Sequence, residues 1–258
     1  MVLEKRATEQ RSIDEALSLL DRKVHHARAV IDRLRRIATI PSGARVLDVG
    51  SAQGYFLIAC DRMGFDAVGV EPYEPAIEVS RRLATEVGAR IDVTHGNAEA
   101  LPFDPNTFDI VHANSVIEHV DDAGAAFSEA YRVLKPGGVF WFLTASSLSP
   151  MQSEIRGFPG FGWYPDALKR KIMYWAKEHK PELIGHTGAP AIHWFTPAKA
   201  RAMLATAGFK SVYDRWDLRG TDEGGRTYRV LLSVIRSSTI TKFIADVALP
   251  ACSYAAVK

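Results

Sequence analysis

The sequence has few cysteines, no long apolar run and little net charge, and each shortage excludes a class of protein. Its two cysteines, Cys60 and Cys252, are far apart and form no CxxC pair, so neither a disulfide framework nor a metal site is expected. No stretch approaches the roughly 20 apolar residues of a membrane-spanning helix, and the N-terminus is too polar for a secretory signal. A formal net charge of +2 gives no basis for nucleic-acid binding. These absences predict a cytoplasmic protein with no metal centre and no nucleic-acid partner.

The chain is instead rich in short apolar segments that alternate between the patterns of strands and helices. We expect strands near residues 45–49, 66–70, 91–94, 108–113 and 139–144. We expect helices near residues 54–63, 75–87 and 122–134. This alternation predicts an α/β fold with a doubly wound, mostly parallel, seven-stranded sheet. Strands near 209–215 and 228–236 would complete that sheet as an antiparallel pair.

Residues 1–40 are predicted to form an amphipathic helical extension. Apolar residues from Ile13 to Ala38 recur in steps of four and three, which places them on one face of a long helix. Basic residues occupy the other faces. Packing of the apolar face on the domain is the favoured interpretation, and a lid over the active site, a dimer seam or contact with anionic lipid are the alternatives.

The sequence changes character after the core segment 41–145. Residues 146–195 are rich in glycine, proline, aromatic residues and histidine, and we interpret them as an insertion or cap that helps to bind an acceptor. Its aromatic residues either line an apolar pocket or form the core of the cap itself. A helix with Thr196 as its N-cap opens the segment 196–238, which completes the sheet, and residues 239–258 are expected to form an amphipathic C-terminal tail.

The most informative segment is the apolar strand and glycine loop of residues 46–56. Asp48 lies in the strand, and Gly50 and Gly54 punctuate the turn into the next helix. Such a loop lets a ligand lie against bare backbone at the carboxyl end of a strand, where open α/β sheets bind nucleotides. A dinucleotide fingerprint would need a glycine at the position of Tyr55, so a nicotinamide-dependent oxidoreductase is disfavoured.

Four later segments follow the glycine loop at positions where a nucleotide site would need them. Glu71 ends the second strand, where a carboxylate can accept hydrogen bonds from both hydroxyls of a ribose; a helix cap or a solvated acid is the alternative. The segment 96–103, the strand and exit loop 108–120, and the turn 135–138 come next. Together with the loop they resemble, in order, the motifs of the class I S-adenosylmethionine-dependent methyltransferases of the type 11-like kind.

The resemblance implies a Rossmann-like fold and S-adenosyl-L-methionine as cofactor. Carried over position by position, it implies that the cofactor is bound by Asp48, Gly50, Gly54, Glu71, Asn97, Ala98 and Asn114. Two positions depart from the family pattern, since Ala52 replaces the usual middle glycine and Asn97 replaces an acid. The amide oxygen of Asn97 can still accept a hydrogen bond from an adenine amino group, but without the assistance of a charge.

The resemblance further implies an enzyme that transfers a methyl group to a small-molecule or a lipid- or glycan-like acceptor, with oxygen favoured. His119 is the first candidate for a general base because it follows the fourth strand; a packed or turn-stabilising histidine is the alternative. His186 and His193 are weaker candidates, and His112, inside a strand, is expected to be structural.

Two further questions stay open from the sequence alone. The departures at Ala52 and Asn97 leave room for a catalytically degenerate domain that acts as a binding or regulatory protein. The basic first helix and the amphipathic tail also fit peripheral contact with a membrane that carries the acceptor. The oligomeric state is not decided by any of these features.

Overall fold

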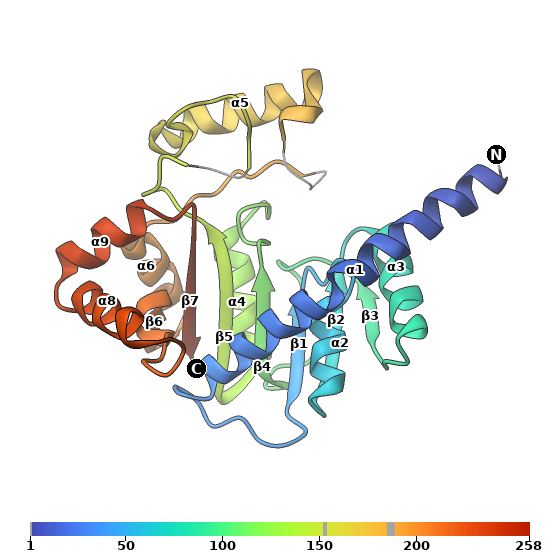
Figure 1. Cartoon of the computed structure of the whole chain (residues 1–258), viewed down its shortest axis with the longest axis horizontal. Coiled ribbons are helices and arrows are strands. Elements are labelled where there is room, and N and C mark those ends of the chain that lie inside the picture. Colours follow the sequence, from blue (N-terminus) through green and yellow to red (C-terminus); the bar gives the residue numbers. More distant parts are fainter. Residues whose placement is uncertain (1, 152–153, 185–188) are drawn as a thin grey trace. The chain divides into compact units, whose positions relative to one another are not determined.

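The structure, a computed structural model, describes residues 2–151, 154–184 and 189–258, with side chains from residue 13 onward. Its strands form one seven-stranded sheet in the order β3-β2-β1-β4-β5-β7-β6 (Figure 1). The strands are β1 (Arg45–Val49), β2 (Asp66–Glu71), β3 (Asp92–His95), β4 (Phe108–Asn114), β5 (Leu134–Ala145), β6 (Ser211–Asp214) and β7 (Ala251–Val257). Strand β1 pairs in parallel with β2 and β4, β2 pairs in parallel with β3, and β6 and β7 are antiparallel. The predicted doubly wound, mostly parallel sheet is confirmed.

The chain divides into two compact units. The first comprises Met1–Ala113, Glu129–Phe140 and Lys258, and the second comprises Asn114–Ser128 and Trp141–Val257. Helix α4 (Ala123–Val133) and strand β5 therefore contribute residues to both.

The first unit contains helices α1 (Val2–Leu34), α2 (Tyr55–Arg62) and α3 (Glu74–Glu86). Helix α1 contacts both α2 and α3. Its apolar face is buried at Ile13, Ala16, Leu20, Val24, Ala27, Val30, Ile31 and Leu34. Because residues three and four positions apart share one side of a helix, this face is committed to the core of the unit. The structure thus supports the packed-helix interpretation of the N-terminal extension.

The second unit contains the remaining helical elements. They are η1 (Phe161–Trp163), α5 (Asp166–His179), η2 (Pro181–Leu183), α6 (Pro197–Ala207), α7 (Arg215–Leu218), α8 (Arg226–Arg236) and α9 (Thr239–Val247). Helix α6 begins as the sequence predicts, because the Thr196 hydroxyl accepts a hydrogen bond from the Lys199 amide at 3.1 Å. Gly208, with φ 111°, ends it.

The sequence-based assignment of the last strand is wrong. Residues 228–236 lie in helix α8, where Tyr228, Leu232 and Ile235 pack with Trp216. The partner of β6 is β7, which lies within the predicted tail and pairs Asp214 with Tyr254. Strand β7 was missed because it is rich in alanine, a residue depleted in strands, whereas the apolar run of α8 fits either period.

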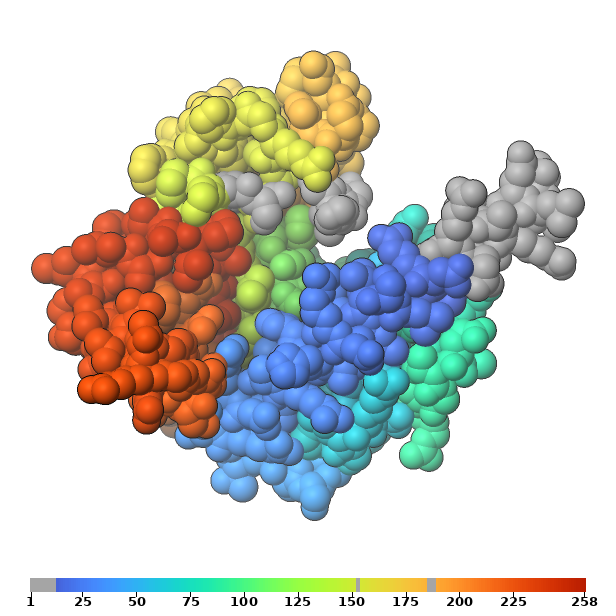
Figure 2. Space-filling view, viewed as in Figure 1, coloured from blue at the N-terminus to red at the C-terminus, as the bar shows by residue number. Residues whose placement is uncertain are grey.

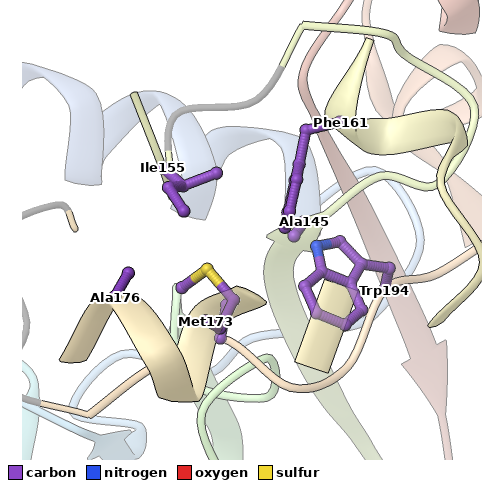
Figure 3. Packing of buried hydrophobic residues seen from close by; sticks show 7 residues of the cluster. Ala145, Ile155, Phe161, Met173, Ala176 and Trp194 are labelled. Atoms are coloured by element: carbon purple, nitrogen blue, oxygen red, sulfur yellow. The ribbon is translucent and has the colours of Figure 1, made fainter. Parts of the chain in front are cut away.

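The cap segment has a core of its own. Ile155, Phe161, Met173 and Trp194 are buried together with small residues around them (Figure 3). The rings of Phe161 and Trp194 meet edge to face, with centroids 6.0 Å apart. These two aromatic residues therefore serve as cap core rather than as an acceptor pocket. Trp163, Tyr174 and Trp175 are exposed instead.

The placement of β7 can be tested through stability. Tyr254 is fully buried in β7, and its ring lies 5.4 Å from that of Phe142. Tyr254→Ala should lower the free energy of unfolding by about 3 to 5 kcal/mol in urea denaturation, because it leaves a large cavity. Ile240→Ala on the exposed side of α9 is the control and should change that energy by less than about 0.5 kcal/mol. Equal effects of the two substitutions would contradict the assignment.

Candidate active site

The glycine loop between β1 and α2 lies directly on strand β2. The amides of Gly50 and Ser51 both donate to the Val70 carbonyl, at 2.7 and 3.2 Å. This approach depends on Gly69, because a Cβ there would lie 2.7 Å from the Ser51 hydroxyl. A Cβ on Gly54 would lie 3.0 Å from that of Ser80. Tight packing against α3 therefore explains why residue 54 is a glycine, independently of any ligand.

Three residues of this loop adopt left-handed backbone conformations. They are Gly50, Ala52 and Gly54, with φ of 68°, 46° and 76°. Ala52 thus takes the conformation that a glycine would adopt freely, at some cost in strain. The departure from the family motif at this position therefore leaves a left-handed turn in place.

Glu71 connects the glycine loop to the end of β2. One oxygen of its buried carboxylate accepts from the Ala52 amide at 2.9 Å, and the other accepts from the Tyr73 amide at 3.0 Å. Since a carboxylate oxygen can accept more than one hydrogen bond, these contacts leave capacity for hydroxyl groups of a ligand. Glu71 is neither a helix cap nor a solvated acid.

Asp48 is paired inside the sheet. Its Oδ1 lies 2.6 Å from Nδ1 of His112 on the neighbouring strand β4, and both side chains are buried. Phe56, in the first turn of α2, stacks on the His112 ring with centroids 3.6 Å apart and planes 4° apart. Asp48 therefore connects β1 to β4 and, through the stacked rings, to α2. His112 has the structural place that the sequence predicts.

The segment after β3 is tied both to Glu71 and to helix α4. The Gly96 amide donates to the Glu71 carbonyl at 3.3 Å. The side-chain oxygen of Asn97 accepts from the Ala100 amide at 3.0 Å, so it closes a local turn. Ala98 and Leu101 are buried beside it.

Two residues of α4 that the sequence analysis did not select hold this segment in place. Glu129 accepts a hydrogen bond from the Leu101 amide at 2.7 Å, and Arg132 donates to the carbonyls of Leu101 and Phe103. The hydrogen bond from Arg132 holds the pKa of the Glu129 carboxyl below its ordinary value. Glu129 and Arg132 have opposite charges and lie three residues apart in a predicted helix, and this spacing was the feature of the sequence that could have indicated their pairing.

The first unit therefore brings together most of the residues expected to bind the cofactor. The loop at 50–54, Glu71 and the segment 96–98 are joined by direct hydrogen bonds. The buried Ser51 hydroxyl has no hydrogen-bond partner among the described residues. Backbone amides, a buried carboxylate and a buried hydroxyl without a partner fit the ribose and polar groups of a nucleoside cofactor.

In the second unit, the loop after β4 contains a buried acid. Glu118 accepts a hydrogen bond from the Thr144 hydroxyl at 2.9 Å, and burial raises the pKa of its carboxyl to about 7. Its backbone carbonyl accepts from the amides of Ile192 and His193, at 2.7 and 3.1 Å. Glu118 therefore ties this loop to β5 and to the end of the cap. Nothing in the sequence indicated that Glu118 would be buried.

His119 and His193 lie in the same neighbourhood. Burial lowers the pKa of both imidazoles, and hydrogen bonds to the backbone at Ala189 and Pro190 only partly oppose this for His119. Nδ1 of His119 is buried without a hydrogen-bond partner in the part of the chain that the structure describes. Asn114, the last residue of β4, is exposed, and Ser115 after it has φ 57°. His186 lies outside the described residues.

Comparison with known proteins identifies the family. A family model described as a methyltransferase domain matches residues 47–142. A protein of Mycobacterium sp. (strain KMS), named an uncharacterized methyltransferase, is 39% identical over 182 residues, which are 69% of this chain and 69% of that protein. The chain belongs to the class I S-adenosylmethionine-dependent methyltransferases.

Other members and structures agree with this methyltransferase assignment. The ubiquinone biosynthesis O-methyltransferase of Azorhizobium caulinodans is 31% identical over 168 residues, and the match spans 65% of this chain and 59% of that protein. The crystal structure of an S-adenosylmethionine-dependent methyltransferase from Mesorhizobium loti is similar in fold, with a TM-score of 0.59 at 18% identity. That match covers 89% of this chain and 98% of the other.

Relief of backbone strain in the glycine loop of this methyltransferase should be measurable. A side chain in the left-handed region costs about 1 kcal/mol, so Ala52→Gly should raise the free energy of unfolding by about 0.5 to 1 kcal/mol. Ala202→Gly, at an exposed position of α6, should instead lower it by about 1 kcal/mol. Urea denaturation of both variants checks this, and a loss of stability in Ala52→Gly equal to that of the control would refute it.

Proposed function

We propose that this methyltransferase transfers the methyl group of S-adenosylmethionine to a hydroxyl oxygen of a small-molecule or a lipid- or glycan-like acceptor. The observation that carries the proposal is the state of His119. Its pKa is lowered by burial, and its Nδ1 has no hydrogen-bond partner in the described residues. A neutral imidazole with an unprotonated ring nitrogen can take the proton that an attacking hydroxyl must lose.

The first unit supplies the groups that would hold the cofactor. We assign the ribose to the Glu71 carboxylate, since the loop amide it accepts from fixes its position. The backbone at Gly50 and Gly54 would border the rest of the cofactor, and Asn97 and Ala98 would meet the adenine. Asp48 would act by holding β1 in register with His112.

The residues of the chain need to contribute little covalent chemistry to this reaction. The bound cofactor supplies a methyl group already activated on a sulfonium. His119 would accept the proton that the acceptor hydroxyl loses as it takes up this methyl group. The residues of the chain mainly align the groups for this in-line displacement.

The preference for oxygen has support from one relative. The Azorhizobium caulinodans protein is named as an O-methyltransferase, and we extend the type of acceptor atom, not the acceptor itself, to this chain. The alternative of a catalytically degenerate binding protein is weakened by Ala52, which adopts a left-handed conformation despite its Cβ.

Labelled methyl transfer tests the proposal directly. Purified protein is incubated with methyl-labelled S-adenosylmethionine and cell extract divided into lipid, sugar and small-molecule fractions. We expect label in one fraction, present as an O-methyl group by mass spectrometry. Tight cofactor binding with no label in any fraction would favour the degenerate alternative, and label on nitrogen or carbon would overturn the choice of oxygen.

The ribose assignment predicts a loss of cofactor affinity in Glu71→Ala. Hydrogen bonds to a charged group contribute about 1.5 to 3 kcal/mol each, so the Kd for S-adenosylmethionine should rise at least about tenfold in calorimetry. Glu74→Ala removes an exposed carboxylate three residues away and should leave the Kd unchanged. The same Kd in wild type and Glu71→Ala would remove Glu71 from the site.

The assignment of the base predicts a selective loss of turnover in His119→Ala. A positioned general base contributes about 10²- to 10⁴-fold, so kcat should fall by at least about 10², while the Kd for S-adenosylmethionine stays within about twofold. His25→Ala, at an exposed position of α1, controls for general effects of losing a histidine. Wild-type turnover in His119→Ala would exclude it as the base.

The pH dependence of turnover should separate His119 from Glu118. The base must be neutral to accept a proton, and burial lowers the pKa of His119 from 6.5, so activity should fall with decreasing pH only below about 6.5. Burial raises the pKa of Glu118 to about 7, so an acid limb that belongs to His119 should lie below that value and persist in Glu118→Gln. Loss of the acid limb in that variant would assign it to Glu118 instead.

A further inference from the structure

Helices α8 and α9 each expose a stripe of large apolar side chains. The stripe on α8 consists of Val230, Leu231 and Val234, and the stripe on α9 of Ile240, Phe243 and Ile244. Their exposed fractions run from 52% at Val234 to 71% at Ile240. Because one member of each stripe lies three and four residues from the other two, each stripe occupies one side of its helix. We call these six residues the α8–α9 stripes.

The stripes are not needed to hold the two helices in the fold. A different side of α8 carries Leu232 and Ile235, which are buried against Trp216 with Ala245 and Leu249 packed on them. Figure 2 shows α8 in orange and α9 in red, with no other segment covering them in that view. Helix α8 thus has one apolar side in the core and a second in solvent, and the neighbouring α9 adds another exposed apolar side, which is unusual for the surface of a globular protein.

The charges around the α8–α9 stripes indicate the chemistry of a partner. Helices α8 and α9 carry three arginines and one lysine, against the single acid Asp246. Lys242 is paired with Asp214 and Asp217, and Arg236 donates to backbone carbonyls, so the positive charge offered to a partner is that of the other two arginines. The carboxylate of Asp246 accepts a hydrogen bond from the Trp216 indole. Arg226 and Arg229 are exposed, and Arg226 lines a shallow depression together with Val230, Leu231 and Val234. Apolar and cationic side chains therefore lie next to each other on α8.

An apolar surface with positive charge at its edge fits a partner that is apolar inside and negative outside. A bilayer containing anionic lipid has this composition, and amphipathic helices with basic residues bind it in the interfacial plane. A second copy of the same face would instead bring arginines of like charge together. Among the described residues no helix is long and apolar enough to cross a membrane.

We propose that the α8–α9 stripes dock on an anionic lipid surface. The apolar side chains enter the boundary between headgroups and acyl chains, and Arg226 and Arg229 face the lipid phosphates. The apolar face of α1 is buried from Ile13 to Leu34, so that part of the helix is not the docking element. This docking does not depend on which molecule accepts the methyl group.

Vesicle co-sedimentation of the full chain tests the proposal. The probes are vesicles of phosphatidylcholine with a quarter phosphatidylglycerol, and vesicles of phosphatidylcholine alone. We expect the wild type to partition onto the anionic vesicles, and the double variant Phe243→Ser, Ile244→Ser to bind at least about tenfold more weakly. Leu168→Ser, which removes an apolar side chain 45% exposed on α5, is the matched control and should bind as the wild type does.

The contribution of the two arginines to vesicle binding can be tested separately. Each of Arg226→Gln and Arg229→Gln should weaken binding to anionic vesicles about fivefold, with no effect on neutral vesicles and a smaller effect at high salt. The sites are exposed, so the urea midpoint and the Kd for S-adenosylmethionine should stay as in the wild type. That cofactor measurement also distinguishes failure of docking from failure of the proposed function.

Three results would overturn the proposal. The first is absence of wild-type binding to anionic vesicles at millimolar lipid. The second is equal weakening by Leu168→Ser and by the double variant. The third is a dimer in sedimentation analysis that the double variant dissociates, because the occupant of the stripes would then be a second copy of this chain.

Discussion

The hydrogen bond between the Glu71 carboxylate and the Ala52 amide is the contact on which the cofactor half of the molecule depends. It joins the loop after β1 to the end of β2, and the Glu71 carbonyl then receives the Gly96 amide from the end of β3. One residue thus connects the carboxyl ends of three neighbouring parallel strands. The approach is so close that Gly69 admits no side chain. A buried carboxylate that ordered these loops before any ligand arrived would reduce the entropy lost on binding.

Glu118 likewise connects neighbouring segments in the second unit, but through different contacts. Its backbone carbonyl anchors the end of the cap, while its carboxylate is held by Thr144 and kept from water. The adjacent His119 is therefore set in a partly desolvated loop, and this burial lowers the pKa of its imidazole and so favours the neutral form. Clusters of groups with shifted pKa values are a mark of functional sites. The cap contributes to this environment through its backbone, whereas its buried aromatic residues are occupied in its own core.

The sequence predicted the parallel half of the sheet well because each strand there is a short apolar run between clear turn signals. The glycine loop and Glu71 could be found for the same reason, as their positions follow from the strand ends. The roles of Glu129, Arg132 and Glu118 could not, since they depend on contacts between residues 26 to 31 positions apart. Strand β7 was missed because its three alanines are depleted in strands and outweigh its single tyrosine, and its place between β5 and β6 in the sheet selects the extended conformation.

The misassigned helix α8 is itself informative. A helix that buries one side shows a period of 3.6 residues, and a strand that buries one face shows a period of two. The run from Tyr228 to Ile235 can be placed on either period, because its apolar residues include both the buried Leu232 and Ile235 and the exposed Val230, Leu231 and Val234. The ambiguity arises because α8 has more apolar residues than the fold buries. Helix α9 has such an excess too, and a surface that makes a second apolar contact with a partner needs these extra residues. The excess of apolar residues that makes the secondary structure of α8 ambiguous in the sequence therefore also identifies the proposed docking surface.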